Sequence, residues 1–150
     1  MGIRVGEALT ILHWLESRTD VDRDRIYIGG RGVGAVVALL AALLSGKPKK
    51  LVCAGMITHF AAMLEEYPNR WKSDLIIPEV LKYYDIPDLL AAYEGEVLLL
   101  NPLDGGKEPV SREQAEWIYD KALTKGRNVR ILTGLDEREI GRQLAQFMLS

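Results

Sequence analysis

The chain has 150 residues, of which 48% are hydrophobic, and a formal net charge of -2. This length suffices for one domain, here residues 1–150, that buries roughly two-thirds of the surface its unfolded form exposes. The scattered Lys and Arg residues form no basic stripe, so nucleic acid is not an expected partner, and the longest apolar run, Val33–Leu44, is too short to span a bilayer.

The cysteine content indicates a reducing environment. Cys53 is the single cysteine and lies in an apolar run, so it forms no internal disulfide and is predicted to be a buried thiol. We therefore expect a cytoplasmic location, although a signal upstream of Met1 is compatible with everything that the sequence shows. No spacing of His, Cys, Asp or Glu indicates a metal site, and no cofactor is expected.

The first predicted element is an amphipathic helix from Gly2 to Ser17, whose apolar side chains recur at helical spacing. No Ser, Thr, Asp or Asn cap precedes Ile3, so we expect the chain to begin inside a larger domain that has lost its N-terminal part. A polar loop follows, and Arg25–Ile28 is predicted to be a short buried strand. The run Gly34–Ser45 is apolar on nearly every side, which predicts a buried helix that ends at Gly46.

The next segments alternate strands with helices. Leu51–Met56 is predicted to be a second buried strand, which gives a β-α-β unit with parallel strands. Residues 58–93 are rich in aromatic residues and prolines and are predicted to form a small helical cap, with Trp71, Tyr83 and Tyr84 packing it onto the sheet. Val97–Asn101 is predicted to be the third strand.

The C-terminal part completes the alternation. Ser111 with Gln114 forms a capping box that predicts a helix to about Lys125. Val129–Thr133 is predicted to be the fourth strand, and Asp136 with Glu139 is predicted to cap a last helix through Leu149. The sequence thus predicts an α/β fold with a mostly parallel sheet of about four strands and flanking helices.

The segment Gly30-Arg31-Gly32-Val33-Gly34 fits the nucleophile-elbow pattern Gly-x-Ser-x-Gly, except that Gly32 stands where the serine belongs. The order of strand, elbow, buried helix, strand, helical insertion, strand with an acidic loop, helix, strand and last helix resembles the C-terminal half of an α/β-hydrolase. It is most similar to the acetyl xylan esterase and dienelactone hydrolase-like members of that superfamily. The segments Asp85–Ala92 and Val97–Asp104 resemble the part that precedes and carries their catalytic acid.

The resemblance implies a serine nucleophile, an acid after the next-but-one strand and a histidine after the last strand. Here Gly32 occupies the nucleophile position, Asp104 matches the acid, and the loop 134–138 contains no histidine. The resemblance also implies that the amide of Val33 donates half of an oxyanion hole. We therefore expect an esterase-type domain that is catalytically inactive and either binds an ester, a carboxylate or a carbohydrate in its pocket or serves as part of a larger protein.

An alternative function uses the same glycines. Gly30, Gly32 and Ala35 fit Gly-x-Gly-x-x-Ala, the fingerprint of a dinucleotide-binding Rossmann-like domain. That fingerprint requires an acidic residue after the second strand, where this chain reads Cys53-Ala54-Gly55-Met56. The missing acid makes dinucleotide binding the second choice.

Three side chains near the predicted pocket each have two interpretations. Arg31 either pins its loop or clamps an anion, His59 is either structural or a binding residue, and Asp104 either braces its loop or is the retained acid. The absent early strands would leave the outer edge of Arg25–Ile28 exposed. We expect the first helix, a second copy of the chain or an upstream segment to cover that edge.

Overall fold

The structure is a computed structural model that describes residues 1–65, 70–71 and 73–150. One sheet contains four parallel strands in the order of the chain: β1 (Tyr27–Arg31), β2 (Lys50–Ala54), β3 (Glu96–Leu100) and β4 (Val129–Leu132). The predicted α/β class and the parallel β-α-β arrangement are confirmed.

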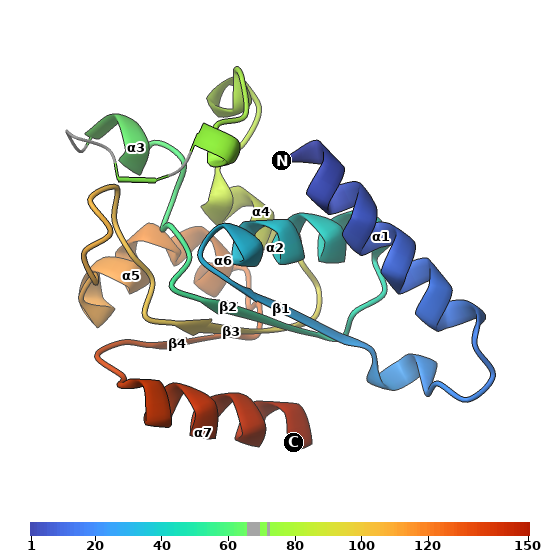
Figure 1. Cartoon of the computed structure of the whole chain (residues 1–150). Coiled ribbons are helices and arrows are strands. Elements are labelled where there is room, and N and C mark those ends of the chain that lie inside the picture. The colour runs from blue at the N-terminus through green and yellow to red at the C-terminus, as the bar shows by residue number, and fades with distance from the viewer. Residues whose placement is uncertain (66–69, 72) are drawn as a thin grey trace.

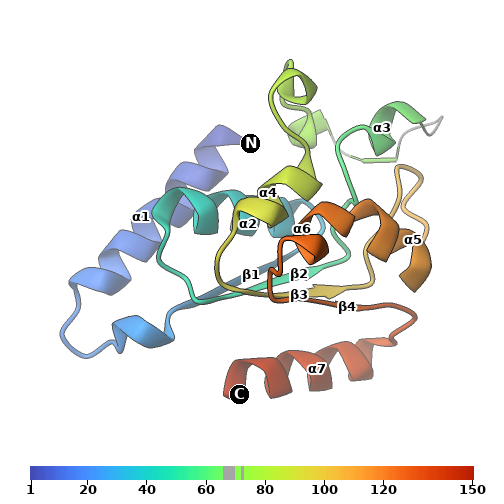
Figure 2. The ribbon, with the colours of Figure 1, turned by 180° about the vertical axis from the view of Figure 1, so that it is seen from behind.

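Helices cover both faces of this sheet (Figures 1 and 2). One face carries the helices that precede β1 or connect the strands, namely α1 (Gly2–Ser17), α2 (Val33–Ser45), α4 (Ile86–Ala92), α5 (Arg112–Ile118) and α6 (Asp120–Thr124). The opposite face carries α7 (Glu137–Leu149). No helix in the described part of the chain is long and apolar enough to cross a membrane.

Short helices fill the remaining connections. The 3₁₀ helix η1 (Arg23–Arg25) leads into β1. The predicted cap region contains α3 (Ala62–Glu65) and the 3₁₀ helices η2 (Ser73–Leu75) and η3 (Val80–Lys82), which rise on the side of the sheet away from α7 (Figures 1 and 2).

Helix α2 is buried because it packs against the sheet, α1 and α4. Its side chains Ala35, Val36 and Leu39 are completely inaccessible to solvent. Gly30 permits this close packing: a Cβ added there would lie 2.1 Å from the carbonyl oxygen of Gly34. The helix ends as predicted at Gly46, which has a left-handed φ of 63° and donates its N–H to the carbonyl of Ala42.

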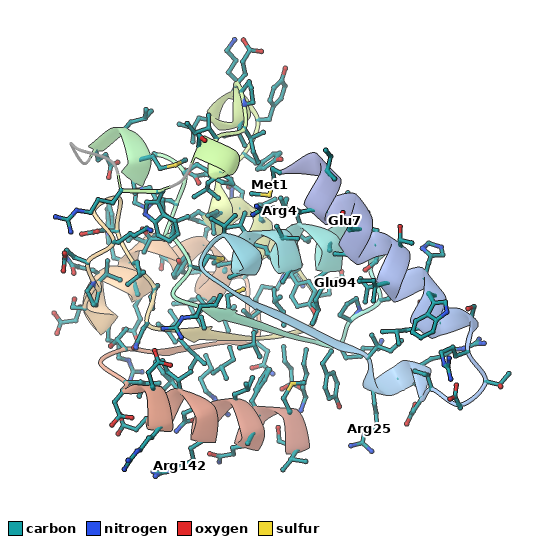
Figure 3. All side chains as sticks on the ribbon, in the orientation of Figure 1. Met1, Arg4, Glu7, Arg25, Glu94 and Arg142 are labelled. Carbon is teal, nitrogen blue, oxygen red and sulfur yellow. The ribbon has the colours of Figure 1, made fainter. Side chains whose placement is uncertain are left out.

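Helix α7 covers the other face through Phe147, which packs with Val52, Leu98 and Leu100 of the sheet. Lys50 fastens the C-terminal end of this helix. Its buried Nζ donates to the carbonyl of Phe147 at 2.7 Å and to Oγ of Ser150 at 3.0 Å. The same ammonium lies 5.1 Å from the ring centroid of Phe147, a distance typical of a cation–π contact. Arg142, on the outer side of α7, points away from the sheet (Figure 3).

Several predicted boundaries are wrong. The first strand is Tyr27–Arg31 rather than Arg25–Ile28, and Arg25 belongs to η1. The prediction that this strand is buried is also wrong, because β1 lies at the edge of the sheet and none of its residues is buried. The glycines of β1 remain extended because this segment pairs in register with Val52–Ala54 of β2, which outweighs their low strand propensity. The second strand begins at Lys50 and stops at Ala54, before Gly55 with its left-handed φ of 53°.

Other differences lie in the C-terminal half and in the cap. The third strand runs from Glu96 and ends at Leu100, and the fourth strand ends at Leu132. The helix predicted to reach Lys125 is broken at Tyr119, whose N–H donates to the carbonyls of both Ala115 and Trp117 and whose ring is fully buried. Trp71 is buried and Tyr84 is partly buried, as predicted for cap residues, whereas the expectation for Tyr83 is wrong because it is 79% exposed.

Strand β1 forms one edge of the sheet, as predicted. Ile26 accepts from the N–H of Lys49, and Gly32 donates to the carbonyl of Ala54. Since backbone groups alternate in direction along a parallel strand, those of Tyr27, Gly29 and Arg31 face the open edge. Helix α1 packs on α2 beside this edge and leaves an apolar groove of about 230 Å³ between itself and β1.

Candidate functional site

A cavity of about 740 Å³ lies at the carboxyl ends of the four strands. Its lining includes residues that directly follow strands or lie in the next loop: Gly32 after β1, Gly55 after β2, Asn101 after β3 and Leu135 after β4. Ligands of open α/β sheets bind outside the carboxyl ends of the strands. We call this space the elbow cavity.

Gly32 forms the turn between β1 and α2. Its φ of 57° and ψ of -123° lie in a backbone region that residues other than glycine rarely adopt. The turn is held by two backbone hydrogen bonds: the N–H of Gly32 donates to the carbonyl of Ala54 at 2.9 Å, and its carbonyl accepts from the N–H of Ala35 at 3.1 Å. No atom lies within 4 Å of a Cβ added at Gly32. The backbone is thus that of a tight strand-to-helix turn, with open space where a side chain would stand.

The first turn of α2 supplies hydrogen-bond donors to the cavity. Val33 and Gly34 both line it and are the first two residues of the helix. N–H groups in a first helical turn have no acceptor within the helix, and the helix dipole adds partial positive charge there. This end of the cavity therefore attracts an anion or a carbonyl oxygen.

Among the described residues, the charged lining comprises three cationic side chains, those of Arg4, Arg31 and Lys107, and two acidic ones, those of Asp136 and Glu137. Arg4 belongs to the first turn of α1 and is labelled in Figure 3. The ammonium of Lys107 lies 5.3 Å from the ring centroid of Trp71, another lining residue.

One ion pair lies along the wall of the elbow cavity. Nη1 of Arg31 donates to Oε2 of Glu137 at 3.1 Å, and Nη2 donates to Oε1 at 2.5 Å, so that the guanidinium fork binds both carboxylate oxygens. The hydrogen bond with Arg31 lowers the pKa of Glu137, and the same bond raises the pKa of Arg31. The guanidinium of Arg31 is thus paired with a carboxylate of the chain itself, that of the first residue of α7.

Asn101 is a site residue that the sequence reasoning missed. Its side chain donates to the carbonyl of Leu135 at 2.7 Å and accepts from the N–H of the same residue at 3.0 Å. This pair joins the loop after β3 to the loop after β4. The signal in the sequence was an asparagine directly after a buried apolar strand. Asn101 has a φ of 46°, which asparagine adopts more readily than most residues do.

Asp104 and His59 line a different cavity, of about 760 Å³. Oδ1 of Asp104 accepts from the N–H of Glu108 at 2.8 Å, and its carbonyl accepts from the indole N–H of Trp71 at 2.8 Å. His59 contacts Thr58 through Nδ1 at 2.9 Å and the carboxylate of Glu65 through Nε2 at 3.2 Å. Gly32, Val33 and Arg31 thus share one cavity, and Asp104 and His59 share another.

The remaining candidates are inert or absent. Cys53 is buried, as predicted, and burial raises the pKa of its thiol, which keeps it protonated. Ala54 and Gly55 lie where a dinucleotide site would need an acidic residue. In residues 1–65, 70–71 and 73–150 there is no group of three His, Cys, Asp or Glu residues that could hold a metal ion.

No protein-family model matches the sequence, and no curated protein matches it. Solved structures do match. The acetyl xylan esterase from Paenibacillus sp. R4 superimposes with a TM-score of 0.64 at 17% identity, over 95% of this chain and 50% of the esterase. Acetyl xylan esterase 1 from Thermoanaerobacterium sp. JW/SL YS485 gives a TM-score of 0.60 at 17% identity, with the same coverage. The acylaminoacyl peptidase of Pyrococcus horikoshii gives 0.64 at 16% identity, over 93% of this chain and 25% of the peptidase.

The chain has an α/β-hydrolase fold. The resemblance predicted from the order of elements is confirmed at this level. This α/β-hydrolase-fold domain spans half the length of the two esterases and a quarter of the length of the peptidase. At such low identity the likeness concerns the fold, so the roles of Gly32, Val33, Arg31, His59 and Asp104 stay predictions.

Proposed function

We propose that this α/β-hydrolase-fold domain binds small acyl compounds, either esters or carboxylates, in the elbow cavity and does not hydrolyse esters by a serine route. One observation supports the proposal most strongly: Gly32 keeps a left-handed turn at the mouth of α2 and has no side chain. The backbone of an elbow is present there without a nucleophilic oxygen.

Ester hydrolysis by a serine enzyme needs a hydroxyl nucleophile and a base within hydrogen-bond reach of it. Gly32 supplies no hydroxyl. The two histidines of the chain lie elsewhere: His13 is exposed on α1, and His59 lines the second cavity. Acyl transfer through a serine and a histidine therefore has neither group in place.

Binding has different requirements, and the elbow cavity supports them. The N–H groups of Val33 and Gly34 are positioned to donate to a carbonyl or carboxylate oxygen, as backbone donors do in oxyanion sites. The cationic side chains of Arg31 and Lys107 in the lining favour an oxygen that carries negative charge. Leu103, Leu135 and Ile140 provide apolar surface for a short acyl chain.

The two parts of the proposal are tested separately. Hydrolysis of p-nitrophenyl acetate should not exceed that of a heat-inactivated sample, for the native chain and for Gly32→Ser alike, because no histidine is available to deprotonate the new hydroxyl. Turnover that grows with the concentration of native protein would refute inactivity. Binding is measured by titrating butyrate into ¹⁵N-labelled protein, where the amide signals of Val33 and Gly34 should shift and 1-butanol should cause no such shift.

The edge of β1 supports a second role, as part of a larger assembly. Backbone groups of Tyr27, Gly29 and Arg31 face an open edge, and exposed strand edges pair readily with other strands. We propose that a strand from a second copy or from another segment of the same protein pairs with β1. Sedimentation equilibrium distinguishes these sources, since a second copy doubles the mass at high concentration and another segment leaves a monomer.

A further inference from the structure

The ion pair between Arg31 and Glu137 indicates which ligand the elbow cavity takes. The two residues are 106 positions apart in the sequence. Arg31 ends β1, immediately before Gly32, and Glu137 begins α7. Both line the elbow cavity together with the first turn of α2. A carboxylate of the chain is thus already seated on the arginine fork at the place where a ligand would enter.

This internal contact is weak enough for a ligand to replace it. The side chains of Arg31 and Glu137 are 70% and 69% exposed. Exposed ion pairs contribute about 0.2–1 kcal/mol, because water screens them and ordering two side chains costs entropy. A ligand that also contacts the N–H groups of Val33 and Gly34 makes hydrogen bonds that Glu137 does not make, and these favour the ligand over Glu137.

The shape and charge of the site define the ligand class. A guanidinium fork matches a planar carboxylate with two parallel hydrogen bonds. Phosphate also accepts two such bonds, but it carries more negative charge than a carboxylate at neutral pH, and the cavity keeps the carboxylates of Asp136 and Glu137 in its lining. These two carboxylates repel a dianion more strongly than a monoanion.

We propose that Glu137 occupies the position of a ligand carboxylate on Arg31, and that a small monocarboxylate displaces it when the ligand binds. This inference rests on the proposed function, since it assigns a ligand class and an internal competitor to the same cavity. Arg31 is then the residue that binds the ligand carboxylate, and competition from Glu137 raises the apparent dissociation constant of the ligand.

The test uses butyrate as the probe and the variants Glu137→Gln and Arg31→Gln, titrated by NMR or calorimetry. Removing the competitor should tighten butyrate binding by about 1.4- to fivefold, which is what the free energy of an exposed pair allows. Arg31→Gln should weaken binding by at least as much. Butyramide should bind less tightly than butyrate to both the native chain and Glu137→Gln, and inorganic phosphate should bind less tightly than butyrate to the native chain.

The matched control is Glu116→Gln, which removes the acid of an exposed Arg112–Glu116 ion pair on α5, outside the elbow cavity. Its butyrate affinity should equal that of the native chain, and thermal unfolding of all variants should confirm that each is folded. If Glu137→Gln also binds with native affinity, the inference is overturned while the proposed function stands. If neither the native chain nor Glu137→Gln binds butyrate, the proposed function fails with it. Tighter binding of phosphate than of butyrate to the native chain overturns the ligand class.

Discussion

Replacing Gly32 by alanine tests the conformation on which the site depends. Its φ of 57° and ψ of -123° are unfavourable for any residue with a Cβ. Among the described residues beyond its own chain neighbours, no heavy atom lies within 4 Å of that Cβ, so we attribute the expected effect to backbone strain. Residues held in such sparsely populated regions lose about 1–3 kcal/mol. We expect Gly32→Ala to lower the free energy of unfolding by this amount, or the Tm by about 2–12 °C in a chain of this size.

Two neighbouring glycines calibrate the measurement. A Cβ at Gly34 also meets nothing within 4 Å, but Gly34 is helical, so Gly34→Ala should raise stability by about 0.5–1 kcal/mol. Gly30→Ala should be the most damaging of the three because its Cβ would overlap the backbone of Gly34. Urea unfolding followed by far-ultraviolet circular dichroism ranks all three. If Gly32→Ala were as stable as the native chain or more stable, the strained-turn reasoning would be refuted.

Four further substitutions have defined outcomes. The buried hydroxyl of Tyr119 has no hydrogen-bond partner among the described residues, whereas that of Tyr93 donates to the carbonyl of Pro48. Tyr119→Phe should therefore leave the free energy of unfolding unchanged or raise it by about 1 kcal/mol, and Tyr93→Phe should lower it by about 1 kcal/mol. Asp85 accepts from three backbone N–H groups, so Asp85→Ala should cost about 2–4 kcal/mol in urea titrations, and a loss below 1 kcal/mol would contradict that role. The hydrogen bond from Lys121 lowers the pKa of Asp88 below its ordinary value of 3.8. The stabilisation that this bond provides is present above pH 3.8 and is lost as the pH falls below it. Lys121→Met should therefore make the free energy of unfolding depend less steeply on pH in this acidic range.

Local patterns in the sequence were sufficient for most of the fold. The apolar run of α2 and its stop at Gly46 depend on residues close together in the chain, and both predictions are confirmed. The capping boxes at Ser111 and Asp136 form as predicted, for the same reason. Each of these features is decided by side chains within four positions of one another, which is the range over which sequence patterns carry structural information.

Boundaries that depend on distant partners were not predictable. Gly29 and Gly30 have low strand propensity, yet they belong to β1 because β2 offers a complete ladder of backbone partners. The break at Tyr119 depends on where a buried ring fits between helices and sheet. Neither constraint can be read from the residues of the segment itself.

The site divides in the same way. The glycine turn was visible because the pattern around Gly32 is contiguous. The sequence did not show that Asp104 and His59 line another cavity, because their positions depend on how the loops after β2 and β3 pair through Ile57 and Leu103. The contact of Arg31 with Glu137 joins the first strand to the last helix, and no local pattern encodes such a distance.

Helix α7 is fastened at both ends, and this affects how the domain opens. The pairing of Asn101 with Leu135 holds the loop before its first turn, and Lys50 holds the carbonyl of Phe147 near its last. Releasing one end leaves the other attached, so partial detachment exposes the apolar face of the helix without gaining the freedom of a loose segment. Amide hydrogens along α7 should therefore exchange with solvent in one cooperative event rather than by fraying from the C-terminal end. The face of the sheet beneath it is exposed all at once or not at all.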